Sequence, residues 1–321
     1  MAYSWLTALA KSEESTHVYR GPSSPLTSLA VSKEGAEIYA GCWDKTIWSW
    51  HTKTCTPGRR FYGHTDFVKA LLLFSAEGTE ILVSGGADTS IIIWKCASGE
   101  KLHVLKGHAR GILALTLDVA ASTDDFSIFS ASSDPHIRRW RLTKDLAFAE
   151  EVQSENPISQ HETSVNALRS DEDGDLWTAS SDGTAKCLSR ERGWQADTVL
   201  HHHDYVRDVA IDEIGGLIVS VGRDEEVKIW QRSSGELWHS YSGHYEEITG
   251  CTILNYQRLI TISIDCTIRR WSLRADDLEK AREEALGQEN GENNGTELSA
   301  EPNNVLTEEE ERELAELMEN D

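Results

Sequence analysis

Residues 81–94 read ILVSGGADTSIIIW, and this stretch decides the fold of the 321-residue chain. Two apolar, β-branched runs flank a short polar turn, in which Asp88 lies six residues before Trp94. The same pairing recurs at Asp44/Trp50, Asp134/Trp140, Asp224/Trp230 and Asp265/Trp271, whereas Leu188 replaces the tryptophan after Asp182. Successive aspartates are 44, 46, 48, 42 and 41 residues apart. The chain is therefore built from six repeats.

This period indicates the architecture, because a repeat of about 40 to 45 residues is typical of one four-stranded blade in a β-propeller. We expect an all-β, six-bladed propeller over residues 15–274, after a short N-terminal segment at 1–14. An acidic tail follows at 275–321, where we count 17 Asp and Glu against 3 Lys and Arg.

Two further columns of polar residues keep step with the aspartates. His64, His108, His161, His202 and His244 each stand four residues before an aliphatic residue that begins an apolar run. Ser84, Ser130, Thr178, Ser220 and Thr261 each stand four residues before their aspartate. Both columns border strand-like runs such as RLITIS, residues 258–263.

With these columns aligned, about four-fifths of the chain resembles the WD-repeat family. The resemblance implies a buried latch in each blade, in which Asp holds His, His meets the hydroxyl, and the hydroxyl meets the Trp indole. Four full latches follow: His64/Ser84/Asp88/Trp94, His108/Ser130/Asp134/Trp140, His202/Ser220/Asp224/Trp230 and His244/Thr261/Asp265/Trp271. The fourth repeat has Leu188, and the first has Pro22 and Ala40 in place of His and Ser, so we expect these two blades to be weaker.

The last repeat lacks a clear fourth strand before the charged tail. The stretch STHVYRG at 15–21 precedes the first inner strand as KLHVLKG at 101–107 precedes a later one. Closing the ring with this N-terminal strand would remove exposed sheet edges, so we expect that arrangement. An open ring completed by the strand of a partner is the alternative.

Composition limits the possible partners and compartments. The formal net charge of −23 disfavours non-specific binding to nucleic acid or anionic membrane. The six cysteines are scattered without a CxxC pair and are expected to be reduced. We find neither a signal peptide nor an apolar run approaching 18 residues, which predicts a cytoplasmic or nuclear location.

The recurring Ser, His and Asp do not predict an enzyme, because a catalytic triad is not duplicated in every structural unit. The run HHHD at 201–204 does not predict a metal site, since His202 belongs to a latch and adjacent histidines diverge in a turn. No nucleotide-binding motif is present, and we expect no cofactor and no small-molecule substrate.

Binding residues should therefore be sought on the loops at one end of the propeller. The resemblance implies that partner contacts gather just before each aspartate and beside the first aliphatic residue of each inner strand. In these columns the candidates are Trp43, Phe67, Lys69, Tyr205, Arg207, Arg223, Glu247 and Ile264. Aromatic anchors beside cations favour a short peptide with an apolar anchor and an acidic or phosphorylated residue.

The tail is a second candidate contact. It is expected to be largely disordered, with helix-forming composition in RADDLEKAREEALGQ at 274–288 and a short helix near 307–319. In that second helix Leu314, Leu317 and Met318 share one face, which could fold on a partner. The alternative is a tail that only solubilises the protein.

The sequence thus predicts a non-enzymatic protein-interaction scaffold or adaptor whose partners are other proteins. Two more specific hypotheses remain open. One is a ubiquitin-ligase substrate receptor that recognises acidic or phosphorylated motifs through Arg207 and Arg223. The other is an acidic assembly chaperone for a basic client such as a ribosomal protein.

Overall fold

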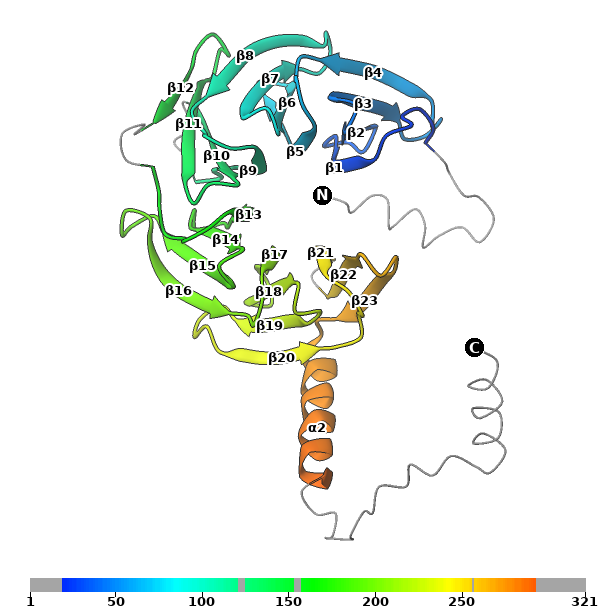
Figure 1. Cartoon of the computed structure of the whole chain (residues 1–321), viewed down its shortest axis with the longest axis vertical. Helices are drawn as coiled ribbons and strands as arrows, with labels where there is room; N and C mark the ends of the chain where they lie inside the picture. Colours follow the sequence, from blue (N-terminus) through cyan, green and yellow to red (C-terminus); the bar gives the residue numbers. More distant parts are fainter. Residues whose placement is uncertain (1–18, 121–124, 153–156, 256, 293–321) are drawn as a thin grey trace, which may run out of the picture. The chain divides into compact units, whose positions relative to one another are not determined.

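A computed structural model describes residues 19–120, 125–152, 157–255 and 257–292. Six antiparallel sheets, each folded from a continuous stretch of chain, are arranged around a common centre (Figure 1). The sheets belong to one unit that ends at Leu278, and a second unit begins at Glu279. The sheets are the six predicted blades, so the all-β propeller is confirmed.

The first three blades have four strands each. Blade 1 contains β1 (Leu26–Val31), β2 (Glu37–Cys42), β3 (Thr46–His51) and β4 (Pro57–Tyr62); blade 2 contains β5 (Val68–Ala76), β6 (Thr79–Gly86), β7 (Ser90–Lys95) and β8 (Glu100–Lys106); blade 3 contains β9 (Ile112–Leu117), β10 (Asp125–Ser132), β11 (Ile137–Thr143) and β12 (Ala149–Val152). Each strand pairs with its neighbour in sequence.

The last three blades repeat this order, but blade 6 has only three strands among the residues that are described. Blade 4 contains β13 (Val165–Ser170), β14 (Leu176–Ser180), β15 (Thr184–Ser189) and β16 (Gln195–His201); blade 5 contains β17 (Val206–Asp212), β18 (Leu217–Gly222), β19 (Val227–Gln231) and β20 (Leu237–Tyr241); blade 6 contains β21 (Ile248–Leu254), β22 (Arg258–Ser263) and β23 (Ile268–Ser272).

The aspartate of each repeat sits in the tight turn between the second and third strands. The residue after it has a left-handed backbone in five blades, with φ of 71° at Lys45 and 67° at Thr89. Such a φ is unfavourable for a residue with a side chain. The aspartate offsets this cost, because Asp88 Oδ1 accepts a hydrogen bond of 3.1 Å from the Ser90 amide.

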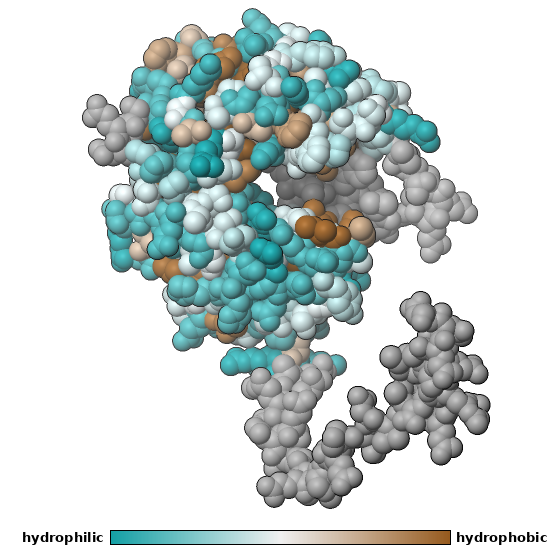
Figure 2. All heavy atoms as spheres, viewed as in Figure 1, coloured by the Kyte–Doolittle hydropathy of each residue, from teal (hydrophilic) through white to brown (hydrophobic). Residues whose placement is uncertain are grey.

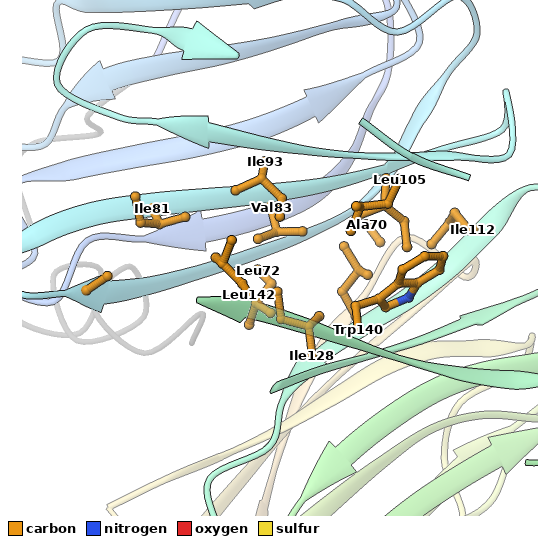
Figure 3. Close-up of a cluster of buried hydrophobic side chains, with 13 residues drawn as sticks. Ala70, Leu72, Ile81, Val83, Ile93, Leu105, Ile112, Ile128, Trp140 and Leu142 are labelled. Atoms are coloured by element: carbon orange, nitrogen blue, oxygen red, sulfur yellow. The ribbon is translucent and has the colours of Figure 1, made fainter. Parts of the chain in front are cut away.

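The hydrophobic core lies between neighbouring blades. Five buried apolar clusters fill the five joints from blade 1 to blade 6, one cluster at each joint. Figure 3 shows the cluster between blades 2 and 3, which joins Val83 and Ile93 of blade 2 with Ile112 and Trp140 of blade 3 in one group of buried side chains. No such cluster is found between blades 6 and 1 in the described part of the chain.

Closure by an N-terminal strand stays a prediction, because residues 15–18 lie outside the described residues and 19–21 are not in a strand. The described end of that segment contacts blade 1. The ring of Tyr19 lies 6.2 Å from that of Trp50, edge to face. The indole nitrogen of Trp50 donates a hydrogen bond of 3.0 Å to the carbonyl of Arg20.

The tail begins with helix α2 (Ala275–Glu292), which covers the stretch of helix-forming composition at 274–288. Asp276 and Asp277 lie in its first turn, where negative charge favours the helix dipole. The predicted second helix near 307–319 falls outside the described residues. The described part of the chain holds no helix that is long and apolar enough to cross a membrane.

Candidate functional site

The repeated polar columns form hydrogen-bonded chains inside the blades. In blade 2, His64 Nδ1 lies 3.0 Å from Asp88 Oδ2, and His64 Nε2 lies 2.8 Å from Ser84 Oγ. The indole nitrogen of Trp94 donates a hydrogen bond of 2.8 Å to the same hydroxyl. One serine hydroxyl therefore joins the imidazole to the indole.

The same chain of contacts is present in blades 3, 5 and 6. The distance from the histidine to the aspartate is 3.1 Å at His108, 2.8 Å at His202 and 2.7 Å at His244. Trp140, Trp230 and Trp271 donate to Ser130, Ser220 and Thr261. All four predicted latches thus have the hydrogen bonds that the family resemblance implies.

Burial and hydrogen bonding shift the pKa values of the latch groups. Burial lowers the pKa of His64 and of His108, although Asp88 and Asp134 act in the opposite direction. Burial would raise the pKa of Asp224, but hydrogen bonds and charge from His202 and Lys228 lower it to about 2. Hydrogen bonds and the charge of the neighbouring histidines likewise lower the pKa of Asp88 and Asp134 against the effect of burial, so the latches of blades 2 and 3 pair neutral imidazoles with ionised carboxylates at neutral pH.

The two incomplete latches are compensated differently. In blade 4, His161 still contacts Asp182 and Thr178, at 2.8 and 2.7 Å, and Leu188 is fully buried. In blade 1, Asp44 accepts hydrogen bonds from the Trp48 indole and the Arg60 guanidinium, at 2.9 and 3.1 Å.

The geometry of the latches does not favour catalysis. Ser84 Oγ, Ser130 Oγ and Ser220 Oγ are buried, and each already accepts the indole N–H of its blade. A nucleophile needs a free approach for its substrate. Among the residues with described positions, no group of three His, Cys, Asp or Glu could hold a metal ion.

The predicted binding columns share one hydrogen bond that repeats six times. The amide just before each aspartate donates to the carbonyl just before the first aliphatic residue of the inner strand. The pairs are Trp43/Pro25, Ala87/Phe67, Ser133/Gly111, Ser181/Ser164, Arg223/Tyr205 and Ile264/Glu247, at 2.7 to 3.0 Å. Because the bond is the same in every blade, the two columns lie side by side at the same end of each.

Trp43 and Phe67 form an aromatic pair across the joint of blades 1 and 2. Their rings are stacked with centroids 4.9 Å apart and planes 13° apart. Trp43 is nevertheless 47% exposed. We call this pair the aromatic platform. Large, rigid and exposed rings are the side chains that most often anchor a binding partner.

Apart from Lys69, the remaining candidates lie on blades 5 and 6, and both arginines among them are already paired. Arg207 forms an ion pair with Glu247. Arg223 Nε lies 3.7 Å from Asp204 Oδ2, and its guanidinium lies 5.5 Å from the ring centre of Tyr205. Ile264 is exposed beside them on blade 6. The predicted residues therefore form two groups: the aromatic platform on blades 1 and 2, and the paired residues on blades 5 and 6.

The remaining predicted residues are Lys69 and the three apolar residues of the tail. Lys69 makes no ion pair within the described ranges, so it is the cation of the predicted set that a ligand could use. Leu314, Leu317 and Met318 lie outside the described residues. Sequence reasoning missed Leu26, Ile262 and Ile268, which are exposed although their counterparts in the other blades are mostly apolar and buried.

Comparison with solved structures supports the fold. The WD40 β-propeller domain of Doa1 superposes with a TM-score of 0.64 and 22% identity, over 78% of this chain and 79% of that one. A computationally designed protein, Ika8, superposes with a TM-score of 0.62 and 26% identity, over 79% of this chain and 73% of that one.

Sequence comparison identifies relatives. An uncharacterized WD repeat-containing protein of Schizosaccharomyces pombe is 36% identical over 312 residues, 94% of this chain and 78% of the relative. Nuclear distribution protein nudF of Aspergillus niger is 29% identical over 187 residues, 57% of this chain but only 40% of that relative. The model of the WD domain, G-beta repeat, matches residues 13–51, 55–95, 99–141, 152–188 and 194–231, and the chain therefore belongs to the WD-repeat family.

Proposed function

We propose that this protein is a non-enzymatic interaction scaffold that binds peptide segments of other proteins at the end of the propeller carrying the aromatic platform. The observation that carries this proposal is the exposed ring of Trp43, which stacks on the partly buried ring of Phe67. WD-repeat propellers generally act as scaffolds for protein interactions. The platform supplies a place on this ring where a partner could be anchored.

The chemistry of the platform favours an apolar or aromatic anchor in the bound peptide. Stacking and burial of such a side chain on Trp43 would remove apolar surface from water. Lys69, on the inner strand of blade 2, could form an ion pair with an acidic residue of the same peptide. The platform therefore suits a peptide with a bulky apolar residue near a carboxylate.

Recognition of phosphorylated motifs by Arg207 and Arg223 receives less support. A phosphate would have to displace Glu247 from Arg207 and Asp204 from Arg223. It would also meet the repulsion of these carboxylates. The ligase-receptor hypothesis is for this reason weaker than the general scaffold.

The acidic tail is proposed as a second contact, and the protein as cytoplasmic or nuclear. Helix α2 carries many acidic residues and could engage a basic surface of a client. The chaperone hypothesis depends on this tail alone, because the platform is aromatic rather than acidic.

Affinity purification with quantitative mass spectrometry tests the proposal. The chain would be compared with a variant in which Trp43, Phe67, Arg207 and Arg223 are all alanine, and with a chain lacking residues 275–321. A matched control is Phe148→Ala, which removes an exposed aromatic ring from a hairpin of blade 3. Partners that bind the platform should be lost with the quadruple variant and kept with the control.

The quadruple substitution and the deletion of the tail together separate the hypotheses. A basic client that is lost only with the tail would select the chaperone hypothesis. Partners that persist after the quadruple substitution and after removal of the tail would contradict both proposed contacts.

A further inference from the structure

A groove of about 720 Å³ lies between blades 1 and 2. Blade 1 lines it with residues of β2, β3 and β4, and blade 2 with residues at the start of β6 and the end of β7. The lining includes Tyr39, Ser49 and Cys96, which are buried, and two carboxylates, those of Glu37 and Glu80. We call this space the side groove.

The side groove is open because a side chain that fills the later joints is small at this one. The residue eight positions after the repeat aspartate is Cys96 in blade 2. In blades 3 and 6 it is Leu142 and Leu273, which are buried in the apolar clusters at the joints with the preceding blades. In blades 4 and 5 it is an arginine, Arg190 and Arg232. The shorter side chain of Cys96 leaves the corresponding space between blades 1 and 2 unfilled.

The two arginines show which kind of side chain fits this space. Arg190 of blade 4 crosses to blade 3 and forms an ion pair with Asp118. Arg232 of blade 5 crosses to blade 4, where its Nη2 lies 2.8 Å from Asp171 Oδ2. Both aspartates are buried. At these joints an arginine therefore meets a carboxylate of the preceding blade through a charge-assisted hydrogen bond.

Three further residues of the side groove are polar or small, whereas their counterparts in blade 2 are apolar and help to fill the next joint. A methyl group added at Gly58 would lie 2.5 Å from Ser49 Oγ, so a larger residue does not fit there without movement. The counterparts belong to the apolar cluster between blades 2 and 3 or pack against it. The pairs are Glu37/Ile81, Ser49/Ile93 and Gly58/Leu102.

Both walls of the side groove offer a carboxylate to an arginine. Glu80 of blade 2 stands in the column of Gly174, where an added methyl group would lie 2.8 Å from Arg190 Nε. The side chain of Glu80 thus begins where the arginine of blade 4 passes. Glu37 of blade 1 accepts a hydrogen bond from the Tyr39 hydroxyl. In the described part of the chain, neither glutamate forms an ion pair with a lysine or an arginine.

Positive charge also lines the side groove and limits the number of cations that it can take. Arg59 and Lys95 are part of the lining. Arg59 Nη2 donates a hydrogen bond of 3.0 Å to the carbonyl of Ala97, so its guanidinium bridges the two blades. His51 Nδ1 lies 3.5 Å from Glu37 Oε1. Because like charges repel, the side groove suits a single arginine better than a run of cations.

The charge of the whole protein favours the approach of a cation. The chain has 54 Asp and Glu against 31 Lys and Arg. Hydrophilic residues cover most of the surface seen in Figure 2, and hydrophobic residues form small separate groups on it. Polar and charged contacts are therefore the main means of recognition that this surface offers, and its net negative charge attracts basic segments.

We propose that the side groove receives an arginine side chain of another protein, in the place that Arg190 and Arg232 occupy at the later joints. The guanidinium meets Glu37 and Glu80, and the aliphatic stem packs against the buried wall of the groove. This inference rests on the proposed scaffold function and adds a second contact surface, but it uses no residue of the aromatic platform.

N-acetyl-L-arginine amide is the probe, and NMR chemical shifts of the isotope-labelled full chain show where it binds. The amides of Glu37, Glu80 and Cys96 should shift. The variant E37Q/E80Q removes both charges but keeps an acceptor for Tyr39, and it should weaken binding about tenfold, the effect of two ion pairs. The α-amide of N-acetyl-L-glutamate, a probe of the opposite charge, should not shift these amides.

Removing a cation tests the sign of the charge that the side groove prefers. Lys95→Gln should strengthen binding of the arginine probe about twofold, because one repulsive charge is lost. Lys106→Gln, at an exposed position at the end of β8, is the matched control and should leave binding unchanged. Weaker binding of the arginine probe to K95Q, or an equal response to the glutamate probe, would overturn the proposal.

Filling the side groove from within tests the location of the site. Cys96→Leu copies Leu142 of blade 3 and should abolish binding of the probe, whereas Cys96→Ser keeps the space open and should not. Undiminished binding to a folded C96L variant would overturn the proposal. If C96L does not fold, undiminished binding of the probe to E37Q/E80Q would overturn it instead.

Two other occupants would also overturn the proposal. Shifts of the groove amides on deletion of residues 293–321 would show that the chain's own tail fills the groove. A dimer that C96L dissociates in sedimentation would show that a second copy supplies the arginine. If W43A loses its partners while the probe fails to bind the groove, this inference is wrong and the proposed function stands.

Discussion

The His64 imidazole makes hydrogen bonds through both of its ring nitrogens. Its Nδ1 lies 3.0 Å from Asp88 Oδ2, and its Nε2 lies 2.8 Å from Ser84 Oγ. Replacing His64 by alanine leaves the hydroxyl of Ser84 and the carboxylate of Asp88 without this partner inside blade 2. We expect the free energy of unfolding to fall by about 1–3 kcal/mol. Urea denaturation followed by tryptophan fluorescence would measure the change. His203→Ala, at an exposed position in the loop between β16 of blade 4 and β17 of blade 5, is the control and should change the free energy of unfolding little.

Stability should fall as the pH decreases below neutrality. Burial lowers the pKa of His64 and His108, so the unfolded chain binds more protons than the native chain as the pH falls through about 6.5. The lowered pKa of Asp224, about 2, adds a further loss below about pH 4. Urea denaturation at about pH 8 and about pH 5.5 would measure the first effect. A chain that is more stable at the lower pH would contradict this assignment, and H64N/H108N should show a shallower dependence.

Trp48 should stabilise blade 1 through its indole nitrogen. This group donates a hydrogen bond of 2.9 Å to Asp44, and the Arg60 guanidinium lies 3.8 Å above its ring. Trp48→Phe keeps an aromatic ring but removes the donor, and should lower the free energy of unfolding by about 1 kcal/mol. In an Asp44→Ala background the same substitution should lower the free energy of unfolding by less. Equal decreases in the two backgrounds would show that the hydrogen bond does not contribute to stability.

The aromatic platform should affect binding far more than stability. Trp43 is exposed and stacks on Phe67 at the surface. W43A should therefore lose only the stacking energy and lower the free energy of unfolding by about 0.5–1.5 kcal/mol. Binding of a partner recovered with the intact chain should weaken at least about tenfold, as expected for a binding hot spot. Calorimetry of the variant and titration of the purified partner would measure the two effects separately. A variant that loses stability and binding in proportion would indicate a structural role only.

Much of the fold could be predicted from the sequence, because the latch groups occur at fixed spacings. A buried histidine such as His64 needs both an acid and a hydroxyl, and this need keeps Ser84, Asp88 and Trp94 in register. The same register placed Trp43 and Phe67 in neighbouring columns, although their stacking depends on side-chain angles that no spacing specifies.

Other parts of the site could not be predicted, for two physical reasons. The roles of Trp48 and Arg60 depend on packing within blade 1, where Pro22 and Ala40 break the pattern. Leu26 and Ile268 fit their columns as well as any counterpart does, yet their exposure depends on whether the two end blades meet. Likewise, the charge of Arg207 and Arg223 was visible in the sequence, but their pairing with Glu247 and Asp204 was not.

Site-specific photo-crosslinking tests the central claim most directly. A photoreactive phenylalanine analogue would replace Trp43 on the platform or, as the matched control, Phe148 on blade 3. If the platform is the contact surface of a scaffold, partner proteins should be crosslinked from position 43 and not from position 148, and Phe67→Ala should reduce the yield at position 43. Equal crosslinking from both positions, or partners captured only from position 148, would contradict the account.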